Sequence, residues 1–111
     1  MSATGAVSMS RLSLQYILVP VNATKSGEPY NPTGDTVQFA FLTSFGSVPQ
    51  NSDWVTGNWT TLQNYNYPYV AQCLVGPGGT TTLATATYVI WIQITDNPEI
   101  PVLIAGQLQI I

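Results

Sequence analysis

TYVIWIQIT, residues 87–95, is the stretch of this chain with the clearest hydrophobic periodicity. Alternate residues of an extended chain point to opposite faces, and one face of this stretch carries Tyr88, Ile90, Ile92 and Ile94. The other face carries Val89 and Trp91. A period of two with many β-branched residues predicts a β-strand, and the apolar residues on both sides predict that both faces are partly covered.

Outward from this stretch, shorter segments show the same alternation, and helical periodicity never establishes itself. The expected strands cover residues 12–18, 37–41, 69–75 and 102–111. In the first, Leu12, Leu14, Tyr16 and Leu18 are expected to share one face, and Pro20 should end the strand or confine it to a sheet edge. In the second, Val37, Phe39 and Phe41 are expected to point inward.

Turn residues separate these strands. Gly57-Asn58 lies between two short β-prone arms, which predicts a hairpin closed by a type II′ turn. Gly76-Pro77-Gly78-Gly79 closes the strand before it, and Asp96-Asn97-Pro98 turns the chain after the opening stretch. About seven short strands with turns every 8 to 12 residues predict an all-β fold, an antiparallel β-sandwich of immunoglobulin-like type.

The length of 111 residues fits one domain. We expect residues 11–111 to form this single β-sandwich domain and residues 1–10 to form an N-terminal arm for contact with a neighbouring subunit. The antibody pattern of two cysteines flanking a tryptophan is missing, because Cys73 is the only cysteine. It is expected to pack as a small apolar side chain.

Charged residues make up only 6% of the chain, where an ordinary soluble domain carries roughly 25%. A surface this poor in charge is either covered by polar side chains or covered by neighbouring molecules. The net charge of −3, with two basic side chains, argues against nucleic-acid binding. The apolar stretches fall far short of the ~20 residues that span a bilayer, and no secretory leader is expected.

Catalytic and metal-binding patterns are also missing from the sequence. The chain has no histidine, so it has neither a Ser-His nor a Cys-His pair, and no zinc ligand set is evident. Asp96 and Glu99 could contribute to a calcium site, but turn residues are the favoured interpretation. We therefore expect no enzyme activity, no metal and no cofactor.

The segment DWVTGNWTTLQNYNYPYV, residues 53–70, is unusually rich in aromatic residues. Three interpretations compete: a buried core, a sugar-stacking face, or a surface that binds another protein. Aromatic residues are enriched in interface cores because each buries a large area with few rotamers to fix. The candidate protein–protein contact residues are Trp54, Trp59, Tyr65, Tyr67 and Tyr69. The core remains an equally good interpretation for each ring, and either Trp54 or Trp59, together with Trp91, is expected to lie mainly in the core.

Five segments together resemble a family of small β-sandwich proteins encoded among the virion structural genes of tailed bacteriophages of actinobacteria. They are YILVPVNATKSGEPYNPTGDTVQFAF, DWVTGNW, YVAQCLVGPGG, YVIWIQITDNPEIPV and GQLQII, and they extend over nearly the whole chain. CLVGPGG and W-x-x-x-TDNPE-x-PV are the most specific parts. The resemblance implies a structural role in the particle and supplies no catalytic residues.

The expected function is therefore that of a non-enzymatic virion protein, either head-associated (a capsid decoration or minor capsid subunit) or part of the head-to-tail connector. Its partners would be other virion proteins, major capsid or connector subunits, in a homo-oligomer or a lattice, and its location would be the virion assembled in the bacterial host cytoplasm. One alternative is a carbohydrate-binding module that stacks sugars on Trp54, Trp59 and the tyrosines of this segment, with polar groups from Asp53, Asn58, Gln63 and Asn64. Another is an adhesion domain associated with the tail or a fibre.

Overall fold

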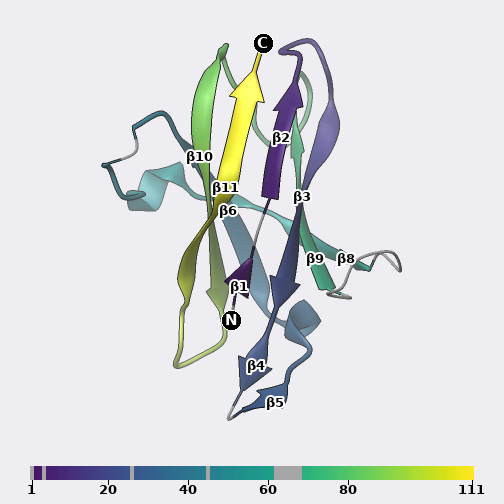
Figure 1. Ribbon diagram of the computed structural model, residues 1–111, viewed down its shortest axis with the longest axis vertical. Helices are drawn as coiled ribbons and strands as arrows, with labels where there is room; N and C mark the ends of the chain where they lie inside the picture. The colour runs from purple at the N-terminus through teal and green to yellow at the C-terminus, as the bar shows by residue number, and fades with distance from the viewer. Residues whose placement is uncertain (1, 4, 26, 45, 62–68) are drawn as a thin grey trace.

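The computed structural model describes residues 2–3, 5–25, 27–44, 46–61 and 69–111, and most of this backbone is extended (Figure 1). The strands form two sheets that share one apolar core. Seven of the described strands have four or more residues. The expected all-β, sandwich-like fold with two sheets is confirmed.

The first sheet has four strands in the order β1-β3-β9-β8, and all of its pairings are antiparallel. These strands are β1 (Ser2–Ala3), β3 (Gln15–Asn22), β9 (Tyr69–Val75) and β8 (Asn58–Thr61). β3 and β9 pair along seven residues and form the centre of this sheet.

The second sheet has five strands in the order β2-β11-β10-β6-β7. These strands are β2 (Gly5–Met9), β11 (Val102–Ile110), β10 (Ala86–Thr95), β6 (Thr36–Leu42) and β7 (Val55–Thr56). β2 runs parallel to β11, and the other three pairings are antiparallel. The expectation of purely antiparallel pairing was therefore wrong at β2.

Three small elements complete the described chain. β4 (Thr24–Lys25) and β5 (Glu28–Pro29) form a short hairpin that projects from the lower end of the molecule in Figure 1. Two short 3₁₀ turns, Pro32–Gly34 and Asn51–Asp53, lie before β6 and before β7.

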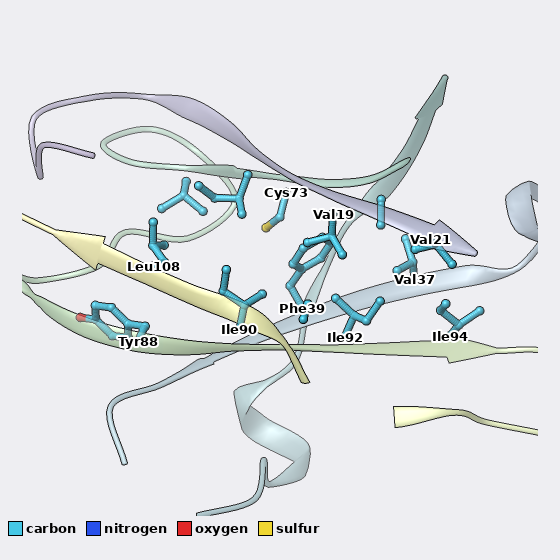
Figure 2. Close-up of a cluster of buried hydrophobic side chains, with 14 of the residues drawn as sticks. Val19, Val21, Val37, Phe39, Cys73, Tyr88, Ile90, Ile92, Ile94 and Leu108 are labelled. Carbon is cyan, nitrogen blue, oxygen red and sulfur yellow. The ribbon is translucent and has the colours of Figure 1, made fainter. Parts of the chain in front are cut away.

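β10 supplies the largest share of the core. Tyr88, Ile90, Ile92 and Ile94 are buried and point toward the first sheet, so the alternation predicted for residues 87–95 is confirmed. Figure 2 shows these side chains facing Val19 and Val21 of β3 and Cys73 of β9, with Phe39 of β6 between them. Full burial of each isoleucine contributes about 1.5–3 kcal/mol.

The face predicted for the first strand was wrong. β3 buries Ile17, Val19 and Val21, and the alternating set that includes Tyr16 and Leu18 points out. Because the side-chain period is two, a shift of one residue moves every side chain to the opposite face. This segment contains two alternating apolar series, Leu-x-Leu-x-Tyr-x-Leu and Ile-x-Val-x-Val. The β-branched series, Ile-x-Val-x-Val, is the one that packs into the core.

Pro20 lies within β3 instead of ending it. β9 pairs with β3 along its length, whereas β1 reaches only Val21 and Asn22 on the other side. Pro20 therefore lies where β3 has no paired neighbour on its second side among the described residues, and a missing N–H is tolerated at such an edge.

The boundary expected at residue 10 also differs from the structure. Residues 2–3 pair with β3 in the first sheet, and residues 5–9 pair with β11 in the second. The described part of the expected arm is thus integrated into both sheets of its own chain. Its uncharged, mixed sequence gives little periodicity, so the pairing partner could not be recognised from the segment itself.

The hairpin predicted at Gly57-Asn58 does not form. β7 pairs with β6 in the second sheet, and β8 pairs with β9 in the first, so Gly57 carries the chain from one sheet to the other. A Cβ atom on Gly57 would lie 2.6 Å from Cε1 of Phe39 and 2.8 Å from the carbonyl oxygen of Gln72. Glycine is needed here for close approach between the sheets, and the Gly57 N–H donates to the Val37 carbonyl over 2.9 Å.

We predict that Gly57→Ala destabilises the fold by about 1–3 kcal/mol, because the added methyl group overpacks the contact with the Phe39 ring. Urea denaturation of both proteins measures the difference. Gly34→Ala is the matched control, since nothing lies within 4 Å of a Cβ built at Gly34. Equal losses in the two variants would contradict the close-approach explanation.

Candidate protein–protein interface

The outer face of the second sheet carries a continuous set of apolar and amide side chains. In the row through its centre, Trp91 of β10 lies between Ala40 of β6 and Ile104 of β11. The neighbouring rows pair Gln93 with Gln38 and Val102, and Val89 with Leu42 and Gln107. We call these residues the Trp91 face: Gln38, Ala40, Leu42, Val89, Trp91, Gln93, Val102, Ile104 and Gln107.

The β11 side of the Trp91 face is the most exposed apolar part. Ile104 is 56% exposed and Val102 is 43% exposed, and Ile100, two residues earlier, is 49% exposed. These side chains recur at every second residue, so they form a ridge along one edge of the face. Exposed apolar residues that are contiguous in this way mark interaction sites more often than scattered ones do.

Trp91 does not lie in the core, contrary to the expectation. Its neighbours Ile90 and Ile92 point inward, so alternation places the half-buried Trp91 ring on the outer face. Its indole Nε1 is buried and has no hydrogen-bond partner among the described residues. A buried donor without an acceptor costs roughly 1–3 kcal/mol.

Trp54 extends the same row beyond β6. It directly precedes Val55, which pairs with Phe39, and its backbone is extended with φ −79° and ψ 131°. Val55 packs against the core, so alternation places Trp54 on the outer face next to Ala40. Ala40 is fully buried although it points outward, which agrees with large side chains on both sides of it.

Trp59 and Tyr69 lie on the first sheet, apart from Trp54. Trp59 packs against the core, and its indole Nε1 donates to the Asp35 carbonyl over 2.9 Å. Tyr69 is half-buried and pairs with Thr61 and Val21. The structure therefore divides the aromatic stretch between two sheets, and Tyr65 and Tyr67 lie outside the described residues.

An open hollow of about 620 Å³ lies beside Trp59. Its wall combines apolar surface with hydroxyl and amide groups, among them those of Thr33, Thr60 and Asn58. Trp54 does not line it, so the two tryptophans do not form a shared stacking platform there.

The outer face of the first sheet also carries exposed apolar side chains. Tyr16 of β3 is about half exposed, and Leu12 and Leu14, which are 77% and 51% exposed, lie in the connection between β2 and β3 at the end of this sheet. Tyr16 pairs with the half-buried Leu74 of β9. Both broad faces of the molecule therefore present apolar groups to the outside.

Charged side chains avoid these faces. Strands β3, β6, β9, β10 and β11 contain none of the seven charged residues. The charges lie in the connections and in the short β4–β5 hairpin: Arg11, Lys25, Glu28, Asp35, Asp53, Asp96 and Glu99. A partner that covers either broad face would thus remove few charges from water, which lowers the desolvation cost of association.

No group of three or more His, Cys, Asp or Glu side chains gathers where a metal ion could be held in the described part of the chain. Burial raises the pKa of the Cys73 thiol to about 11, which makes this thiol a poor nucleophile at neutral pH. No helix in the described ranges is long and apolar enough to cross a membrane.

Sequence reasoning missed Ile104 and Val102 as surface residues. The reason lies in β11, where a bulge lies opposite Ile90 and Trp91 of β10. Gly106 has φ +142° at this irregularity, and inward residues change from odd to even numbers there. Without the bulge, the alternation of this strand cannot be assigned to faces from its residues alone.

No family model, curated protein or solved structure matches this chain.

We predict that Trp91→Phe changes the free energy of unfolding by less than about 1 kcal/mol, because the loss of ring area is offset by removal of the buried indole N–H. Trp59→Phe is the matched control and should cost more, since it leaves the partly buried Asp35 carbonyl without its donor. Urea denaturation at low protein concentration measures both. A larger loss for Trp91→Phe than for Trp59→Phe would contradict the absence of a partner for Nε1.

We predict that Cys73 reacts with thiol reagents about 100-fold more slowly in the native protein than in urea, since its pKa is raised from 9.0 to about 11. The unfolded chain also ionises first as the pH rises, so the stability associated with the protonated thiol is fully present below pH 9 and is lost toward pH 11. Cys73→Ala should make the loss of stability in this pH window smaller. Rapid labelling of the native protein would place the thiol at the surface.

Proposed function

We propose that this chain is a non-enzymatic structural subunit of a tailed-bacteriophage virion, either on the head or at the head-to-tail connector. The observation that carries the proposal is the presence of exposed apolar side chains on both broad faces of a molecule with very few charges. Such faces are poorly solvated in a free monomer. Neighbouring subunits in a ring or lattice would cover them on both sides.

The strand order supports an immunoglobulin-like version of the sandwich. The four-stranded sheet β1-β3-β9-β8 corresponds to the order A-B-E-D, and β11-β10-β6 corresponds to G-F-C with β7 as an added C′ strand. The N-terminal segment contributes β1 to one sheet and β2 to the other. This topology agrees with the fold that the sequence resemblance implies.

Tyr88 adds a second argument for this topology. It lies near the start of β10, and its hydroxyl donates to the Ala84 carbonyl over 2.7 Å. Immunoglobulin-like domains often have such a tyrosine corner at the start of strand F, two residues before a buried cysteine. Here the residue two positions later is the buried Ile90, so packing takes the place of the disulfide.

The sequence resemblance supplies the virion context. The GPGG part of CLVGPGG and the DNPE part of TDNPE-x-PV fall on turns, whereas the flanking residues belong to strands β9, β10 and β11. Gly76 follows β9 with φ +132°, and a Cβ there would collide with the Ser13 carbonyl oxygen. Asp96 and Glu99 exchange backbone hydrogen bonds at the turn between β10 and β11. These motifs therefore have structural reasons, and the proposed role requires no catalytic group from them.

A second candidate function is carbohydrate binding at the hollow beside Trp59. The observation that favours it is the combination of one aromatic ring with hydroxyl and amide groups in an open recess. Binding to a glycan panel, lost in Asn58→Ala, tests this function. Retained binding in that variant would exclude the hollow as the site.

Particle occupancy tests the proposed function. We predict that the wild-type chain copurifies with assembled phage particles and that Tyr16→Ser and Ile104→Ser, one on each broad face, lower its copy number in them. Both positions are exposed, so the fold should be retained. Quantitative mass spectrometry of purified particles gives the copy number.

Val48→Ser is the matched control, because Val48 is 64% exposed but lies in the connection between β6 and β7, away from the paired strands. Its occupancy should equal that of the wild type. Absence of the wild-type chain from particles, or full occupancy in both Tyr16→Ser and Ile104→Ser, would contradict the proposal.

A further inference from the structure

We infer that a hollow on the outer face of the first sheet, beside Tyr16, binds an uncharged sugar, as a mono- or disaccharide unit of a larger glycan. The hollow has a volume of about 430 Å³, which lies within the range of small-molecule sites. We call it the Tyr16 hollow, and the residues that define it are Tyr16, Asn58, Gln72, Leu74 and Thr80. The inference goes beyond the proposed function and does not depend on it.

The Tyr16 hollow forms where β9 loses its neighbour β8. β8 begins at Asn58, which pairs with Gln72, so residues 73–75 of β9 have no β8 residue opposite them. The turn after β9 folds back toward this end, because the Thr80 N–H donates to the Leu74 carbonyl over 2.8 Å. Paired strands and a hydrogen-bonded turn therefore form the walls, as in the pre-formed sites that bind small molecules.

An aromatic ring and an aliphatic side chain supply the apolar part of the hollow. Tyr16 and Leu74 pair across β3 and β9 and point outward, whereas the next residues inward, Ile17 and Cys73, are buried in the core. Tyr16 is 47% exposed and Leu74 is half-buried. A sugar ring has an apolar face of C–H groups, and a partly exposed aromatic ring offers this face a flat contact.

Polar groups without internal partners surround this apolar part. Asn58 and Thr80 are exposed, and Gln72 is half-buried. Among the described residues, neither these three side chains nor the Tyr16 hydroxyl has a hydrogen-bond partner. Amide and hydroxyl groups can both donate and accept, as the hydroxyls of a sugar do. Several such groups around one recess suit a ligand with hydroxyls on neighbouring carbon atoms.

The lack of charge decides which sugars fit. None of the residues that line the Tyr16 hollow is charged. A sugar that carries a carboxylate or a phosphate would lose part of its hydration there without gaining an ion pair. The hollow should therefore prefer neutral sugars.

The Tyr16 hollow adjoins the hollow beside Trp59 and is distinct from it. The two share only residues 56–58 of the segment that crosses between the sheets. Trp59 packs against the core, and its indole N–H is already bonded to the Asp35 carbonyl. Tyr16, by contrast, has nearly half of its surface exposed, so it is the better ring for stacking.

NMR titration of the isotope-labelled full chain with a panel of sugars tests the inference. The panel contains neutral hexoses, pentoses, deoxyhexoses and N-acetylhexosamines as mono- and disaccharides, with uronic acids as charged counterparts. At least one neutral sugar is expected to bind with a dissociation constant of about 0.1–10 mM, as the small size of such ligands implies. It should shift the backbone amides of residues 72–74 and Thr80. Uronic acids should bind at least about fivefold more weakly than this sugar.

Four variants locate the site. Tyr16→Ala and Gln72→Ala should each raise the dissociation constant at least about fivefold, since one removes the stacking ring and the other an amide. Tyr16→Phe keeps the ring and should bind within about threefold of the wild type. Thr61→Ala is the control and should bind as the wild type does, because Thr61 lines only the hollow beside Trp59.

The spectra of the free variants show whether each one is folded, and the shifts in the wild type locate the site without any variant. Absence of binding by every neutral sugar up to about 50 mM would overturn the inference. Shifts confined to the hollow beside Trp59, tighter binding of uronic acids, or unchanged binding in Tyr16→Ala and Gln72→Ala would overturn it as well.

Sugar binding is measured separately from particle occupancy. Tyr16 is also proposed to contact a neighbouring subunit, so a bound sugar and that subunit would compete for this ring. A chain that fills its sites in particles but binds no sugar would overturn the inference and leave the proposed function standing. A chain that binds sugar in the Tyr16 hollow but never enters particles would support the inference and contradict the virion role.

Discussion

The strict alternation of β10 is the constraint on which the rest of the second sheet depends. This strand lies between β11 and β6, so its register sets which residues of both neighbours face the core. Four consecutive inward positions of β10 are buried and apolar, and a slip of one residue would exchange them for Thr87, Val89, Trp91 and Gln93. Burial of Ile90, Ile92 and Ile94 therefore also determines that Trp91 points outward.

The strands with a single apolar series could be predicted from the sequence, and those with two could not. β6 and β10 have one strongly apolar inward series, and the structure has the predicted faces there. β3 has two competing series, and only its contact with β9 decides between them. The short β-prone segments on both sides of Gly57 suggested a hairpin turn. The sequence does not show that each of these segments pairs in a different sheet, and the turn was therefore predicted wrongly.

The sequence predicted which kinds of residue the candidate interface contains better than it predicted where they lie on the fold. A surplus of aromatic rings and a shortage of charge indicated a contact surface, and Trp54 does lie next to the outer row of Ala40 and Trp91. Trp59, by contrast, is anchored by Asp35 at the margin of the core. The exposed ridge on β11 depends on a bulge at Gly106, and such an irregularity follows from pairing between distant segments rather than from local sequence.

The parallel pairing of β2 with β11 has a mechanical consequence. Residues 5–9 run alongside residues 106–110 near the two ends of the chain, so tension that pulls the termini apart acts along the ladder of hydrogen bonds between them. Such a force must shear all five residue pairs together, whereas an antiparallel hairpin under the same load would open one pair at a time. The pairing of residues 5–9 with residues 106–110 is therefore expected to resist stretching of the molecule from its two ends.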